Sequence, residues 1–140
     1  MVNETIDGIS VALSKSFEDV TIYSESIKQG FKEPCFFILN LTSEEQALLG
    51  NRALRITSFN IQYFPKDQFS PKAECQRVAE TLYCVLRSVE LLNGIIINGT
   101  NLNHEIVDNV LHFQVTFKST INYPKPENES MGNLEIKSII

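Results

Sequence analysis

Residues 110–119, towards the C-terminal end of the chain, alternate regularly between apolar and polar side chains. Because successive side chains of a β-strand point to opposite faces of the sheet, this alternation predicts a strand with one buried and one solvated face. Such strands are typical of antiparallel sheets, whose buried face needs a covering layer. The apolar positions are Leu111, Phe113, Val115 and Phe117, and the polar positions are His112, Gln114, Thr116 and Lys118.

Two segments have the periodicity of the helices that could form this layer. Between about residues 3 and 17, apolar side chains recur every three or four positions, which predicts one amphipathic helix. Residues 71–92 keep the same period for longer, with Pro71 at a favourable first position and Asn93-Gly94 as the end of the helix. We therefore expect two helices on the buried face of the sheet.

Other apolar stretches predict the remaining strands. A short strand is expected at residues 20–23, and residues 35–41 are too apolar for a strand with one wet face. That strand is covered on both sides, or has helices on one side and a neighbouring subunit on the other. Residues 54–64 predict its hairpin partner, which is apolar on both faces unless a bulge near Thr57 restores one apolar face. The hairpin tip should project from the body.

Three strands should complete the sheet, at residues 95–98, 101–107 and 110–119, with turns at Asn98-Gly99 and Asp108-Asn109. The order of elements predicts an α+β fold with a mostly antiparallel sheet and two helices packed on one face. Residues 1–123 should form a single domain. Residues 124–140 should be a C-terminal extension whose apolar end docks on this subunit or on a neighbouring one.

Composition argues against several classes of function. The formal net charge of −5 disfavours recognition of nucleic acid, which needs clustered Lys and Arg. We expect no membrane span, since no run approaches the roughly 18 apolar residues required, and we see no secretory signal. The protein should therefore act in the cytoplasm. Three cysteines without metal-ligand spacing suggest buried thiols in a reducing compartment.

The sequence gives little support for catalysis. It contains none of the common phosphate-binding, nucleophile-elbow or zinc-protease motifs. His104 and His112 fit structural or surface positions in the predicted strands. Cys75 could pair with His104 as nucleophile and base, but its place on the apolar stripe of the second helix predicts an inert thiol. We expect no catalytic site, cofactor or metal.

Self-assembly is a better hypothesis than catalysis. The two most apolar strands leave more hydrophobic sheet surface than two helices of this length can hide. Pairing with neighbouring chains is the simplest way to cover that surface.

The order of several short sequences also resembles a known family. They are the opening helix ending in Phe17, IYSE, IKQGF, PCFFI, IQYFP, the helix containing Glu74-Cys75, and IVDNVLHF. In this order they are similar to the tail terminator proteins of phages and phage tail-like particles of Gram-positive bacteria, of the kind found with contractile tails. The likeness spans residues 6–119 and includes no chemically diagnostic motif.

The resemblance implies a compact α+β protein that forms a hexameric ring on the last ring of the tail tube. It implies that the ring stops polymerisation of the tube, meets the sheath in contractile tails and, in a phage, carries the head connector. No catalytic residue or cofactor follows from the family. Assembly would take place in the bacterial host cytoplasm, after which the protein stays in the virion or tail-like particle.

A cap needs projecting elements that contact the tube, and the candidates are the hairpin tip, from about residue 43 to 52, and the C-terminal end, from about residue 133 to 140. The alternative is an ordinary solvent-exposed hairpin and a frayed chain end. Two other hypotheses remain open: another head-tail connector or neck completion protein, and a cytosolic enzyme or small-ligand-binding protein. The candidate partner-contact residues are Glu44, Glu45, Leu48, Leu49 and Arg52 at the tip, and Leu134, Ile136 and Ile139 at the end.

Overall fold

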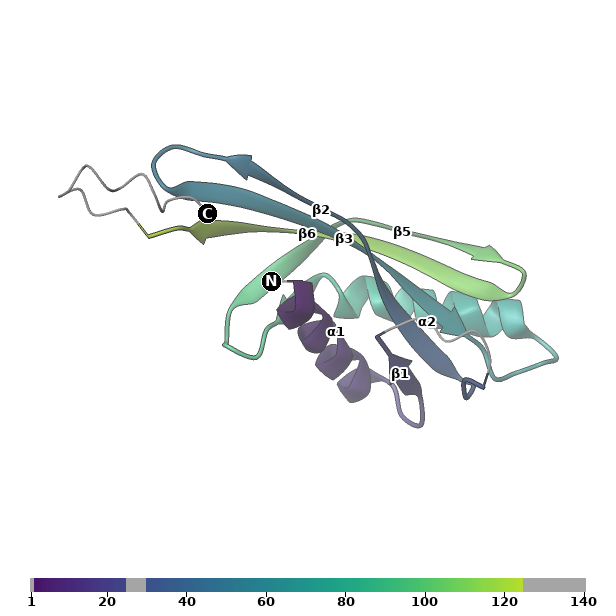
Figure 1. The fold of residues 1–140 in the computed structure, drawn as a ribbon. Helices are drawn as coiled ribbons and strands as arrows, with labels where there is room; N and C mark the ends of the chain where they lie inside the picture. Colours follow the sequence, from purple (N-terminus) through teal and green to yellow (C-terminus); the bar gives the residue numbers. More distant parts are fainter. Residues whose placement is uncertain (1, 25–29, 125–140) are drawn as a thin grey trace.

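The computed structural model describes residues 2–24 and 30–124, and this part of the chain forms two helices and one six-stranded sheet (Figure 1). In chain order the elements are α1 (Val2–Ser16), β1 (Thr21–Tyr23), β2 (Cys35–Ala47), β3 (Arg52–Phe64), α2 (Pro71–Val85), β4 (Ser88–Glu90), β5 (Ile96–Val107) and β6 (Val110–Asn122).

The sheet has the strand order β1-β2-β3-β6-β5-β4. Only the pairing of β1 with β2 is parallel; the four other pairings of the described strands are antiparallel. Both helices lie on the same side of this sheet (Figure 1). The predicted α+β class, with a mostly antiparallel sheet and two helices on one face, is confirmed.

The hydrophobic core lies between the helices and one face of the sheet. The alternation predicted for β6 holds, because Leu111, Phe113, Val115 and Phe117 are all buried there. On β3 the buried positions are Ala53 and every second residue from Thr57 to Tyr63. The helices contribute Ile9 and Leu13 from α1, and Cys75, Val78, Ala79 and Leu82 from α2.

The outer face of the sheet is mostly polar, which contradicts the expectation of a large uncovered apolar surface. Asn60, Ser58 and Gln114 occupy its centre, and the Ser58 and Thr116 hydroxyls lie 2.9 Å apart. At the β1 end this face is apolar, but Phe31 covers it. The Phe31 ring packs against Phe37 and Phe64, so the base of β2 is covered on both sides by its own chain.

Two irregularities bend the sheet along one row. The register shifts between Asn40 and Thr42 on β2, and between Thr100 and Asn103 on β5. The bulge considered near Thr57 as one of two alternatives is absent from β3, which is continuous, and the register shift lies on its partner strand β2. Since Thr42 and Thr100 both belong to the row that contains Ser58 and Thr116, the two bulges increase the twist at the same level.

The second helix is shorter than its sequence period predicts. It ends at Val85, and the following residues form the short strand β4 and a turn instead. The predicted turn at Asn98-Gly99 is also wrong, because both residues lie inside β5. Gly99 is needed there for a close approach, since a Cβ at this position would lie 2.2 Å from the carbonyl oxygen of Leu86.

The β2–β3 hairpin also differs from its prediction. The strands continue to Ala47 and restart at Arg52, so most of the expected tip is strand, and the turn is confined to residues 48–51. We call the distal part of the sheet the arm: residues 42–58 of the hairpin with residues 116–122 of β6. Figure 1 shows the arm extending past both helices.

Candidate functional site: the projecting arm

The arm is held together by strand pairing more than by a hydrophobic core. Residues 41–50 of the hairpin are all exposed, whereas β3 keeps Ala53 and Thr57 buried. On its far side β3 pairs with β6 as far as Arg52 and Asn122, and the Tyr123 amide donates to the Asn51 carbonyl over 2.8 Å. The result is a three-stranded projection that presents two faces, a turn, the edge of β2 and a shorter edge of β6 beyond Lys118, where the pairing with β5 has ended.

A polar cluster fixes the face of the arm that continues the core side. Glu45 lies opposite Arg55 in the ladder, and the two side chains form an ion pair with an N–O distance of 2.7 Å. The Tyr123 hydroxyl lies 2.8 Å from the Glu45 carboxylate, so three strands or their extensions meet there. Hydrogen bonds from Arg55 and then from Tyr123 lower the pKa of Glu45.

The opposite face of the arm carries an apolar stripe. Leu54 and Ile56 alternate with the inward positions of β3 and are half-buried, flanked by Glu44 and Gln46 on β2. Sequence reasoning assigned no contact role to this pair. The available signal was that Ile56 falls on the face of β3 opposite to Phe59.

The turn at the end of the arm is the most exposed apolar site on it. Leu49 is 86% exposed and Leu48 is 37% exposed. Gly50 takes a positive φ of 73°, which a glycine adopts without the strain that a Cβ would bring. Exposed leucines on a well-formed turn are the kind of side chain that anchors a protein contact.

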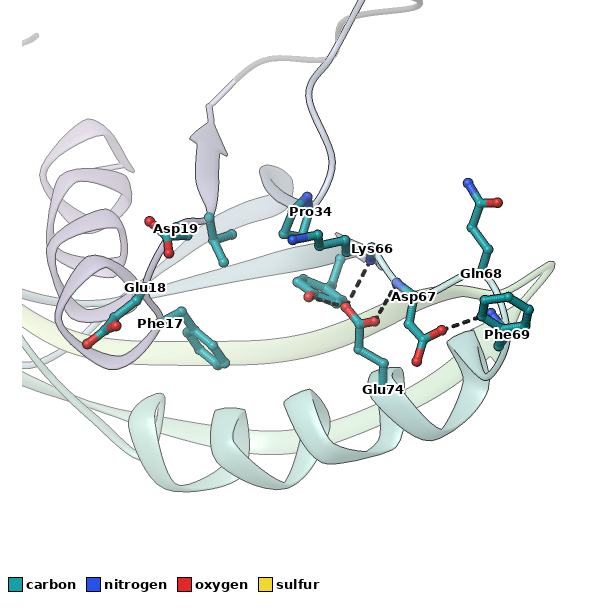
Figure 2. Close-up of a pocket in the computed structure, with 11 residues that line it drawn as sticks. Phe17, Glu18, Asp19, Pro34, Lys66, Asp67, Gln68, Phe69 and Glu74 are labelled. Atoms are coloured by element: carbon teal, nitrogen blue, oxygen red, sulfur yellow. Dashed lines mark hydrogen bonds between the residues drawn. The ribbon is translucent and has the colours of Figure 1, made fainter.

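A second feature is an open cavity of about 780 Å³ between the segment after α1 and the loop before α2 (Figure 2). Its central polar group is the carboxylate of Glu74. This carboxylate accepts hydrogen bonds from the Tyr63 hydroxyl (2.5 Å) and from the amides of Lys66 (3.0 Å) and Asp67 (2.8 Å). Burial alone would raise the pKa of Glu74, but these three hydrogen bonds outweigh it and lower the pKa.

Three further acidic residues, Glu18, Asp19 and Asp67, line the cavity, and the Asp67 carboxylate is likewise engaged. Asp67 accepts from the amides of Phe69 and Ser70 and from the Ser70 hydroxyl, and these bonds lower its pKa. The Glu74 and Asp67 carboxylates therefore hold the loop that leads into α2. This arrangement fits a structural role better than an acid-base pair.

The suggested cysteine-histidine pair does not form. Cys75 is buried and its thiol donates to the Asn109 carbonyl at 3.7 Å. The His104 ring contacts the Tyr83 hydroxyl with Nδ1 (2.8 Å) and the Gln76 side chain with Nε2 (3.2 Å). Burial, followed by the charge of Glu74, raises the pKa of Cys75, so the thiol is a poor nucleophile.

The prediction of three buried thiols is correct for Cys35 and Cys75 and wrong for Cys84, which is exposed on α2. Burial raises the pKa of Cys35 to about 11. In residues 2–24 and 30–124 no group of three His, Cys, Asp or Glu side chains could hold a metal ion. None of the helices in this part of the chain is both long and apolar enough to span a membrane.

Comparison with known proteins now adds what the geometry alone does not provide. A family model described as phage tail terminator protein matches residues 4–129, which is most of the chain. The chain belongs to the phage tail terminator family. No curated protein matches it. Membership confirms the family suggested by the sequence and assigns the tail terminator a structural role in tail assembly.

The arm brings together five of the contact residues predicted for the tail terminator. Glu44, Leu48, Leu49 and Arg52 are exposed along the arm and its turn. Glu45 is different, because its carboxylate contacts Arg55 and Tyr123 within the arm and so stabilises the arm itself. The three remaining candidates, Leu134, Ile136 and Ile139, lie outside the described residues.

Proposed function

We propose that this protein caps the end of a phage or phage-like tail tube as a ring of copies, with six the expected number, and thereby stops polymerisation of the tube. The observation that carries the proposal is the family match over residues 4–129. The arm supports it, because a cap needs elements that extend beyond its own body to contact the tube.

The partners follow from the same proposal. The apolar turn at Leu48 and Leu49 would contact the tail tube protein, and Glu44 and Arg52 would set the register of that contact. The ring would also meet the sheath if the tail is contractile, and the head connector if the particle is a phage. Residues 124–140 would act as an extension that docks on a neighbouring subunit. Assembly would take place in the cytoplasm of the bacterial host.

Deleting the protein from its producing particle tests the capping function. Electron microscopy should then show tubes of unregulated length, and supplying the protein in trans should restore a single length. Tubes of normal length in the deletion would refute capping. Tails of normal length that fail to join heads would instead support a neck completion protein.

A matched pair of variants tests the role of the turn. Leu49→Asp places a charge on the arm, whereas Leu92→Asp changes a leucine that is 72% exposed on the β4–β5 turn. We expect Leu49→Asp to fold normally and to lose length control, while Leu92→Asp retains it. Full length control by the Leu49 variant would exclude the turn as the tube contact and leave capping itself untouched.

A further inference from the structure

One edge of the arm has no strand beside it in the part of the chain that the structure describes. β1 pairs only with Cys35, Phe36 and Phe37, yet β2 continues to Ala47. The exposed stretch of β2 along the arm is therefore an edge strand, and edge strands present unpaired backbone donors and acceptors to other chains.

The hydrogen-bond register identifies which groups face outwards. The Leu48 amide donates to the Arg52 carbonyl over 2.9 Å, and hydrogen-bonded pairs of an antiparallel ladder recur at every second residue. Gln46 and Glu44 therefore also bond to β3. The amides and carbonyls of Ser43, Glu45 and Ala47 point to the open edge.

The end of β6 places the rest of the chain at the tip of the arm, on the side of β3 away from β2. β6 runs towards the tip of the arm and ends at Asn122, opposite Arg52. The sequence continues with prolines at positions 124 and 126, and proline restricts the residue before it to extended conformations. Residues 124–133 could thus carry the chain at most about 35 Å beyond the tip, far enough to reach another copy.

The sequence of residues 134–140, LEIKSII, has the composition that an added strand needs. Leu134 and Ile136 alternate with Glu135 and Lys137. Lys137 would lie opposite Glu44, whose carboxylate accepts a hydrogen bond from the Gln46 side chain over 3.3 Å, on an edge that carries two glutamates.

We propose that residues 134–140 of one copy add to the open edge of β2, at residues 43–47, in a neighbouring copy as an antiparallel strand. The inference rests on the proposed function in one respect, that copies of the chain assemble. It would make the extension of each subunit part of the sheet of the next, which is a heterologous contact of the kind that closes a ring.

Directed cross-linking of two full-length chains tests the donation. In the register that places Lys137 opposite Glu44, Glu135 lies opposite Gln46. Both chains carry Cys84→Ser to remove the exposed thiol; one also carries Gln46→Cys and the other Glu135→Cys. After the chains are mixed and oxidised, mass spectrometry should find position 46 of one chain joined to position 135 of the other. With both substitutions in one chain, dilution should abolish the linkage. A linkage that persists within one chain after dilution would overturn the proposal. So would assembled rings in which the linkage between chains is absent.

A second measurement is independent of cross-linking. Ile136→Asp should raise the protein concentration needed for assembly by about tenfold, as expected for a lost apolar anchor, and speed amide exchange at Ser43, Glu45 and Ala47. Ser138→Ala is the control and should change neither. If Ile136→Asp assembles and controls tube length like the unchanged protein, strand donation fails while capping stands. If strand exchange occurs but tube growth continues, capping fails instead.

Discussion

Glu45 and Arg55 lie opposite each other on β2 and β3, and their ion pair of 2.7 Å stands on the core-side face of an arm that neither α1 nor α2 covers. Because the turn extends from this part of the sheet, order in the cluster should determine how precisely the turn is presented. The Tyr123 hydroxyl joins the pair, so the cluster also connects the hairpin to the end of β6.

Glu45→Gln should therefore loosen the arm while leaving the core intact. We expect faster amide exchange at Glu44 and Gln46, whose amides bond to β3, and unchanged exchange in α2. The double variant Glu45→Arg with Arg55→Glu should slow exchange again. Glu44→Gln is the matched control, because its carboxylate points to the other face. Equal exchange in all variants would show that strand pairing alone orders the arm.

The same cluster predicts a dependence on pH. The hydrogen bonds from Arg55 and Tyr123 lower the pKa of Glu45 below its ordinary value of 4.5. The ordering by the cluster is therefore fully present above that value and is lost as the pH falls through the lower pKa of the folded state. Amide exchange in the arm, corrected for its intrinsic pH dependence, should rise at acid pH in the unchanged protein and vary less in Glu45→Gln.

Glu74 should contribute to global stability. Glu74→Gln replaces one carboxylate oxygen by an NH2 group, which cannot accept a hydrogen bond, so the Tyr63 hydroxyl or at least one of the loop amides loses its acceptor. We expect a loss of about 1–3 kcal/mol in the free energy of unfolding, measured by urea denaturation at neutral pH. Because the pKa of Glu74 is lowered on folding, the difference should shrink as the pH falls through that lowered value. A constant difference at all pH values would show that packing, not the carboxylate, matters.

The sequence pattern correctly predicted the parts of the fold that depend on a regular alternation of apolar and polar side chains. On β6 each apolar side chain lies on the core face, so the period of two was sufficient. On β3 the same period was present, but Ile56 and Phe64 made both faces look apolar. Their cover differs: Phe31 packs on Phe64, whereas Ile56 stays half-buried on the arm. That difference depends on a loop distant in sequence, which periodicity does not report.

The predicted end of α2 was wrong for a related reason. Leu86 and Val89 continue the helical period, and both are buried, but Val89 reaches the core from β4. A buried position has the same apolar side chain in either conformation, so the pattern could not separate them. For the site, the exposed leucines of the turn could be predicted, because Gly50-Asn51, a residue pair that favours turns, follows them directly. The contacts of Glu45 with Arg55 and Tyr123 could not be predicted, because they depend on the register of the strands.

A substitution of Gly99 tests the close approach between β5 and the Leu86 carbonyl, just after the end of α2. Gly99→Ala would bring a Cβ to 2.2 Å from the Leu86 carbonyl oxygen, and backbone atoms cannot yield as a flexible side chain would. We expect a loss of about 3 kcal/mol, at the upper end for overpacking. Gly94→Ala is the control: a Cβ there meets nothing within 4 Å, and only its φ of 89° opposes the substitution. A larger effect at Gly94 would mean that backbone strain, not the contact with Leu86, limits this region.

The three thiols should differ sharply in reactivity. Cys84 is exposed, whereas Cys35 and Cys75 are buried and burial raises the pKa of each. Since only the thiolate alkylates readily, iodoacetamide at neutral pH should label Cys84 alone in the folded protein and all three in urea. Peptide mass spectrometry reads the sites directly. Labelling of Cys35 in the folded protein would imply that the base of β2 opens to solvent. Because Phe31 covers that region, Phe31→Ala should then increase the labelling of Cys35 but not that of Cys75.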